Sequence, residues 1–141
     1  MINGVLLARE EEGNMSTLDI CDINLYTAQC ELMKIGSSYT YIKRGQQVEQ
    51  LEADTLPLGI FHKYELDCPK RQLQDGDYII MISDGILDGV DDDALLREVI
   101  AGTEIRNPQE MANYLLQFVL HKTGGRVYDD MSILVAGIWK S

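Results

Sequence analysis

Residues 73–89 read LQDGDYIIMISDGILDG, and this stretch decides the fold class. Its segment 78–83 is apolar up to the final serine, a pattern typical of a strand buried on both faces. Asp75 and Gly76, just before this segment, favour a turn. Asp84 comes directly after it, where the strand leaves the core. We therefore predict a buried strand that carries a carboxylate at its end.

A second acidic motif lies near the end of the chain. Asp129 and Asp130 immediately precede residues 131–139, MSILVAGIW, which predict a buried and central last strand. If the two strands are neighbours, the carboxylates meet at one edge of a sheet. Carboxylate oxygens are the ligands that Mg²⁺ and Mn²⁺ prefer, and a pair of such ions can activate water and bind a phosphoryl group. The alternative interpretation, turns with solvated acids, stays open at this point.

Two helices are predicted between these motifs. The first begins at residues 91–93 and runs through Gly102, with carboxylates in its first turn, where they suit the helix dipole. The second has Asn107 as its N-cap and Pro108 in the first position. Its apolar residues recur at helical spacing, and Gly124 with Gly125 ends it.

The first half of the chain predicts mainly strands. Residues 1–9 are the exception, because they read as the end of a helix. Apolar segments bounded by turn residues predict strands at 16–26, 30–35, 39–43, 48–51 and 64–73, with an extended segment at 56–60. Runs of strands followed by helices are typical of an α+β fold with antiparallel sheets.

Composition narrows the function classes. A length of 141 residues fits one domain, which we predict to span residues 1–141. The net charge of −11 disfavours nucleic acid and anionic membranes as partners, because both attract basic surfaces.

Three cysteines without a CxxC pair predict reduced thiols. No apolar run reaches the ~18 residues of a membrane span, and we expect a cytoplasmic protein.

Several segments, taken in order, resemble a known family. They are STLDICDINLYTAQCELMKIGSS (16–38), YIKRGQQVE (41–49), LPLGI (56–60), the opening stretch (73–89), NPQEMANYLL (107–116) and GGRVYDDMSILVAGI (124–138). Together they resemble the C-terminal part of the PPM-type metal-dependent serine/threonine phosphatases, and within them the sporulation branch typified by the phosphatase domain of stage II sporulation protein E.

This resemblance implies an α-β-β-α sandwich that hydrolyses phosphoserine or phosphothreonine on proteins with two Mn²⁺ or Mg²⁺ ions. Asp84 matches the acid of the family's SDG motif, and Asp129 matches the acid that opens its D-[DN]-M motif. Both are metal ligands in the family, whereas Asp130 is the neighbouring position and a weaker candidate. For the sporulation branch, the implied substrate is a phosphorylated anti-anti-sigma factor.

One departure from the family pattern changes the expectation. The family places a further Asp-Gly-Met-Gly type metal motif upstream, and no such segment precedes Ser16. We therefore expect an N-terminally incomplete domain, either a fragment or an incomplete gene product, with half of the metal ligands missing and no activity alone. A membrane tether of the sporulation branch would lie upstream. An uncovered sheet favours a homo-oligomer. The alternative function is a non-catalytic regulatory or interaction module.

Overall fold

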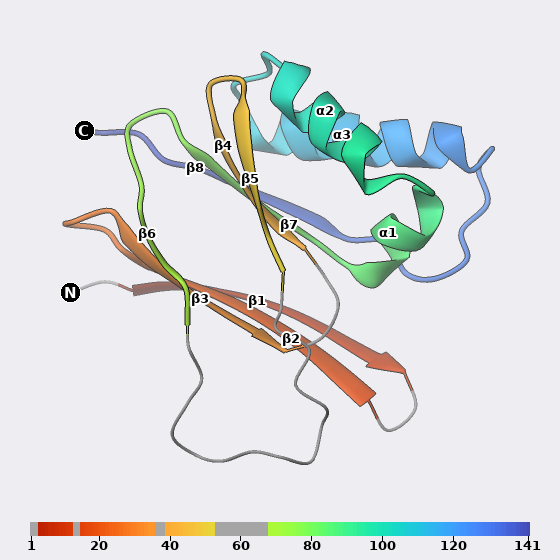
Figure 1. Cartoon of the computed structure of the whole chain (residues 1–141), viewed down its shortest axis with the longest axis horizontal. Helices are drawn as coiled ribbons and strands as arrows, with labels where there is room; N and C mark the ends of the chain where they lie inside the picture. Colours follow the sequence, from red (N-terminus) through yellow and green to blue (C-terminus); the bar gives the residue numbers. More distant parts are fainter. Residues whose placement is uncertain (1–2, 13–14, 36–38, 53–67) are drawn as a thin grey trace. The chain divides into compact units, whose positions relative to one another are not determined.

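The computed structural model describes residues 3–12, 15–35, 39–52 and 68–141, which form eight strands and three helices. Every strand pairing among them is antiparallel, so the fold is α+β, as predicted. The chain divides into two compact units, Met1–Ser37 with Glu52–Leu73 and Ser38–Leu51 with Gln74–Ser141. Each unit contains one sheet of four strands (Figure 1).

The first unit contains a sheet in the order β1-β2-β3-β6. Its strands are β1 (Asn3–Glu12), β2 (Met15–Asn24), β3 (Gln29–Ile35) and β6 (Lys70–Gln72). The strands predicted at 16–26 and 30–35 correspond to β2 and β3, which pair as an antiparallel hairpin. In its turn, the Asn24 side chain accepts hydrogen bonds from the N–H groups of Tyr26 and Thr27, and Ala28 adopts a left-handed φ of 57°.

Strand β1 shows that the helix expected over residues 1–9 was wrong. All ten of its residues pair with β2, from Asn3 opposite Asn24 to Glu12 opposite Met15. A neighbouring strand thus decides the conformation of a segment whose own propensity is weak. The sequence between the two strands is Gly-Asn, one of the pairs that favour a hairpin.

A buried ion pair joins β2 to β3. Asp19 and Lys34 lie directly opposite each other in the register, and the Lys34 Nζ atom is 2.7 Å from Asp19 Oδ1. Each side chain is only 4% exposed. Cys21 and Cys30 are buried in the same sheet, and no disulfide joins Cys21, Cys30 or Cys68 in the described part of the chain.

The second unit contains a sheet in the order β5-β4-β7-β8. Its strands are β4 (Thr40–Arg44), β5 (Gln47–Leu51), β7 (Tyr78–Ile82) and β8 (Ile133–Gly137). All five residues of β7 are buried, which confirms the prediction from the opening stretch. The last strand was expected to be central, but among the described residues β8 pairs only with β7. Its residues are accordingly half-buried.

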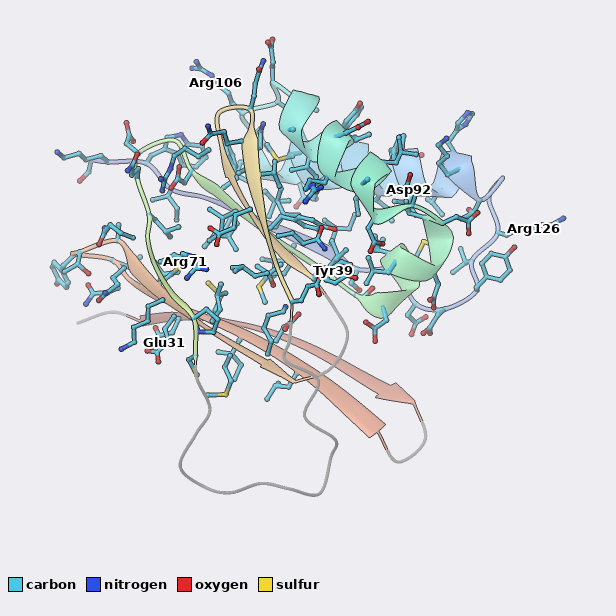
Figure 2. All side chains as sticks on the ribbon, in the orientation of Figure 1. Glu31, Tyr39, Arg71, Asp92, Arg106 and Arg126 are labelled. Atoms are coloured by element: carbon cyan, nitrogen blue, oxygen red, sulfur yellow. The ribbon has the colours of Figure 1, made fainter. Side chains whose placement is uncertain are left out.

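Three helices follow β7 in the chain: α1 (Asp84–Gly89), α2 (Asp93–Gly102) and α3 (Pro108–Lys122). The two long ones begin as predicted, since the side chain of Asp92 accepts from the Ala94 N–H and that of Asn107 from the Glu110 N–H. Asp92 is labelled at the start of α2 in Figure 2. The short helix α1 was not predicted. None of the helices in the described part of the chain is long and apolar enough to cross a membrane.

The core of the second unit lies between its sheet and its helices. The buried side chains of this cluster are Tyr41, Tyr78, Ile80, Ile82, Ile86, Val90, Leu96, Ile100, Met111, Leu115 and Val119. These residues come from alternate positions of the strands and from one face of each helix. Their packing fixes the positions of β7 and of α1, the helix that follows it.

Two charged residues anchor strand β4 within the second unit. The Lys43 Nζ atom donates to the carbonyl oxygens of Gly45 (2.6 Å) and Ala101 (3.0 Å), which ties β4 to the end of α2. Burial lowers the pKa of the Lys43 ammonium group. Arg44 donates two charge-assisted hydrogen bonds to the fully buried Asp77 carboxylate, in the turn predicted around Gly76. The extended segment expected at 56–60 and the first residues of the strand expected at 64–73 lie outside the described residues.

Candidate active site

Strands β7 and β8 bring the two acidic motifs to one edge of the sheet. Ile82, the last residue of β7, pairs with Ile133, the first residue of β8. Asp84 begins α1 immediately after β7, and Asp129 and Asp130 lie just before β8. In Figure 1 the chain returning from α3 to β8 runs beside α1. The two motifs thus meet at one edge, as expected for neighbouring strands, whereas the binding of a metal ion by Asp84 and Asp129 stays a prediction.

The two motifs touch through their backbones. A Cβ atom on Gly85 would lie 2.9 Å from the carbonyl carbon of Asp130 and 3.1 Å from the carbonyl oxygen of Asp129. Both distances are shorter than ordinary van der Waals contact. Only a residue without a side chain allows this approach, which explains the glycine that follows Asp84.

Ser83 joins the same two segments by hydrogen bonds. Its hydroxyl accepts from the Ser132 N–H (2.9 Å) and donates to the Asp130 carbonyl oxygen (3.1 Å). Its own N–H donates to the Ser132 carbonyl oxygen (3.0 Å). We call the two hydroxyl bonds, to Ser132 and to Asp130, the Ser83 bridge. Ser83 itself is buried, so its hydroxyl is largely shielded from water on its own side of these bonds.

The candidate ligands differ in their surroundings. Asp84 and Asp129 are half-buried, whereas Asp130 is exposed. The Asp129 Oδ1 atom accepts a hydrogen bond from the Asp130 N–H (2.7 Å), which orients that carboxylate. Asp130 takes part in the contact between the motifs through its carbonyl group. The ranking of Asp84 and Asp129 ahead of Asp130 as metal ligands stays a prediction.

The donor chemistry at this edge fits a hard divalent cation. Half-buried carboxylate oxygens are ligands for Mg²⁺ and Mn²⁺. Among the described residues, however, no group of three or more His, Cys, Asp or Glu side chains is arranged to hold a metal ion. The edge therefore offers part of a ligand set.

An exposed apolar segment borders the candidate ligands. Gly124 and Gly125 adopt positive φ angles after α3, and the chain then presents Val127 and Tyr128 at 59% and 67% exposure. Figure 2 shows the Arg126 side chain on this segment, directed away from the ribbon. Two exposed apolar side chains thus lie directly before Asp129 in the chain.

Sequence reasoning named the acids and missed the residues that bring them together. Ser83 was expected only as the last residue of the buried strand, and Gly85 was given no role. No signal in the sequence indicated their contact with the second motif, because the helix that begins at Asp84 was itself not predicted.

Comparisons with known proteins agree with the resemblance seen in the sequence. Residues 1–139 match the family model described as stage II sporulation protein E (SpoIIE). Stage II sporulation protein E of Bacillus subtilis (strain 168) is 36% identical over 141 residues, covering 97% of this chain and 17% of the relative. The chain thus spans about a sixth of that protein's length.

Solved structures show the same relationship. The structure of the PP2C phosphatase domain and a fragment of the regulatory domain of Bacillus subtilis SpoIIE matches with a TM-score of 0.79 and 38% identity, over 87% of this chain and 38% of that one. The manganese-presoaked phosphatase domain of the same protein matches with a TM-score of 0.75 and 36% identity, over 89% and 57%. The chain therefore belongs to the stage II sporulation protein E family, within the part that corresponds to its PP2C-type phosphatase domain.

Proposed function

We propose that this chain carries part of the active site of a metal-dependent protein serine/threonine phosphatase. In this proposal, Asp84 and Asp129 bind Mn²⁺ or Mg²⁺ at the edge formed by β7 and β8. The observation that carries it is the convergence of two acidic motifs, because Ile82 pairs with Ile133 and the Ser83 bridge holds the flanking segments together. The manganese-presoaked relative supports a metal of this kind.

Bound divalent ions would supply the positive charge that activates water and stabilises the phosphoryl group during its transfer. The chain's own residues do the positioning. The Asp130 N–H orients the Asp129 carboxylate, and the start of α1 directly after β7 fixes the backbone of Asp84. The exposed segment around Tyr128 leaves room for a protein substrate beside the acids.

The remaining ligands are proposed to come from outside the described residues. This follows from the two carboxylates available at the edge and from the lack of a larger ligand cluster in the part of the chain that the structure describes. We propose that residues 1–141 supply only part of the metal site of a phosphatase domain and that the chain alone has little activity. We also propose that it self-associates and acts in the cytoplasm. The family resemblance makes a phosphorylated anti-anti-sigma factor the proposed substrate.

A non-catalytic regulatory or interaction module is the alternative. The observation in its favour is the same absence of three clustered ligands among the described residues. Such a module would keep the contact between the motifs for stability and would not bind metal at Asp84. The two functions therefore predict different results for metal binding.

The test combines Mn²⁺ binding with hydrolysis of an aryl phosphate. The unsubstituted chain, Asp84→Asn and a control, Asp91→Asn, would be titrated with Mn²⁺ while free Mn²⁺ is followed by electron paramagnetic resonance. Asp91 is exposed and belongs to neither motif, so its substitution removes the same charge without changing a candidate ligand. We expect Asp84→Asn to lose Mn²⁺ binding and Asp91→Asn to retain it.

Hydrolysis separates the remaining cases. Mn²⁺ binding with slow or no release of phosphate agrees with an incomplete site, and Mn²⁺-dependent release that vanishes in Asp84→Asn agrees with a working one. No Mn²⁺ binding by the unsubstituted chain favours the non-catalytic module. Binding or hydrolysis that survives Asp84→Asn contradicts the assignment of Asp84.

A further inference from the structure

The buried hydroxyl of Ser83 uses both of its hydrogen-bonding abilities on one neighbouring segment. It accepts from the Ser132 N–H at 2.9 Å and donates to the Asp130 carbonyl oxygen at 3.1 Å. A serine hydroxyl has a single proton to donate, and here the donation goes to the backbone of the second motif. An alanine in this place would lose both bonds and leave two backbone groups without this partner.

The bridge connects the chain positions next to the two candidate ligands. Asp84 directly follows Ser83, and Asp129 directly precedes Asp130. Consecutive Cα atoms are only about 3.8 Å apart, so a displacement at Ser83 or Asp130 is transmitted to the adjoining acid. The regular pairing of β7 with β8 ends at Ile82 and Ile133, so the bridge acts beyond the last strand pair.

We propose that Ser83 is a positioning residue which sets the separation of Asp84 and Asp129 through the backbone of residues 130–132. This inference rests on the proposed function, because the separation of Asp84 and Asp129 matters for metal binding only if both are ligands. Mg²⁺ requires ligands at about 2.0–2.1 Å in near-octahedral geometry, so small displacements of a carboxylate weaken its binding. Residues that orient metal ligands change affinity by about 10-fold to 100-fold when they are replaced.

Four variants of the full chain test the inference with Mn²⁺ alone as the probe. Ser83→Ala removes the bridge, Ser83→Thr keeps the hydroxyl, and Asp91→Asn removes an exposed charge outside both motifs. Asn107→Ala removes the N-cap of α3 and destabilises the same unit without touching the bridge. It therefore controls for a merely structural effect.

We expect Ser83→Ala to weaken Mn²⁺ binding by about tenfold or more, in the range seen for residues that orient metal ligands. Ser83→Thr, Asp91→Asn and Asn107→Ala should stay within about twofold of the unsubstituted chain, because none of them removes a group that orients a metal ligand. Amide hydrogen exchange gives a second readout that needs no metal. The Ser132 N–H should exchange faster in Ser83→Ala and at an unchanged rate in Asp91→Asn.

The outcomes distinguish this inference from the proposed function. If Asp84→Asn abolishes Mn²⁺ binding while Ser83→Ala leaves it intact, the inference is overturned and the proposed function stands. Equal losses in Ser83→Ala and Asn107→Ala also overturn it, because stability alone would then explain them. If the unsubstituted chain binds no Mn²⁺, or Asp84→Asn binds it normally, the metal site and the inference fail together.

Discussion

Replacing Gly85 by alanine should destabilise the second unit, although alanine is the better helix former. The new Cβ would lie 2.9 Å from the Asp130 carbonyl carbon and closer still to its oxygen. Overpacking of this kind costs about 1–3 kcal/mol, and we place it near 3 because backbone atoms cannot rotate away. Helix propensity returns about 1 kcal/mol. The expected net loss is therefore about 2 kcal/mol in the free energy of unfolding.

Gly102 provides the matched control. It ends α2 in the same unit, and a Cβ there would have no atom within 4 Å. Gly102→Ala should therefore be neutral or stabilising by up to about 1 kcal/mol. Urea unfolding of both variants can be followed through Trp139, the single tryptophan, whose ring packs edge-on against Tyr78 in that unit. If Gly85→Ala unfolds at the same or higher urea concentration than Gly102→Ala, the contact between the motifs is not rigid and the reasoning is refuted.

Three further substitutions test separate features. Ala28→Gly should raise the free energy of unfolding by about 1 kcal/mol, because it relieves a left-handed φ of 57°; a lower urea midpoint would contradict this. Asn107→Ala should lower it by about 1 kcal/mol through loss of the bond to the Glu110 N–H, whereas the exposed mid-helix Asn113→Ala should cost clearly less in the same assay. Lys43→Met tests a pH effect. The folded-state pKa of Lys43 lies below its ordinary value of 10.5. Between these two pKa values the folded chain therefore binds fewer protons than the unfolded chain, and the contribution of Lys43 to the free energy of unfolding rises with pH. Urea midpoints measured across the window should rise more for the unsubstituted chain than for Lys43→Met, and parallel curves would count against the burial of the charge.

Local signals made the helices of the second unit predictable. Asn107 followed by Pro108 marks the start of α3, and the side chain of Asn107 makes the expected bond within the next turn. The five apolar residues of β7 predicted a strand buried on both faces, since no other short element hides consecutive apolar side chains. In each case the information lies within a few residues of the element.

The errors have a common physical cause, since each depends on which other strand the segment pairs with. Residues 3–12 become a strand because β2 offers them a complete set of backbone hydrogen bonds. The segment that forms β8 is apolar enough for a central strand, yet its place at the edge depends on which strands are available to pair with it. Propensity and periodicity do not contain that information.

The candidate site likewise combines features that the sequence predicted with a contact that it did not predict. The motif around Asp84 and the motif around Asp129 were recognisable one at a time, and their chemistry pointed to a divalent cation. Their contact depends on Ser83 reaching across to Ser132, 49 positions further along the chain. A bond of that range is set by the topology of β7 and β8, so only the structure could reveal it.

The buried pair of Asp19 and Lys34 has a consequence for how the first sheet assembles. A slip of β3 by one residue would turn its apolar side chains to the wrong face, and the hydrophobic pattern alone resists it. A slip by two residues keeps every side chain on its face, so that pattern does not resist it. In that register Asp19 would lie opposite Leu32 instead of Lys34. A buried carboxylate without its cation is costly, so this single pair selects the native alignment from the alternative that hydrophobicity tolerates.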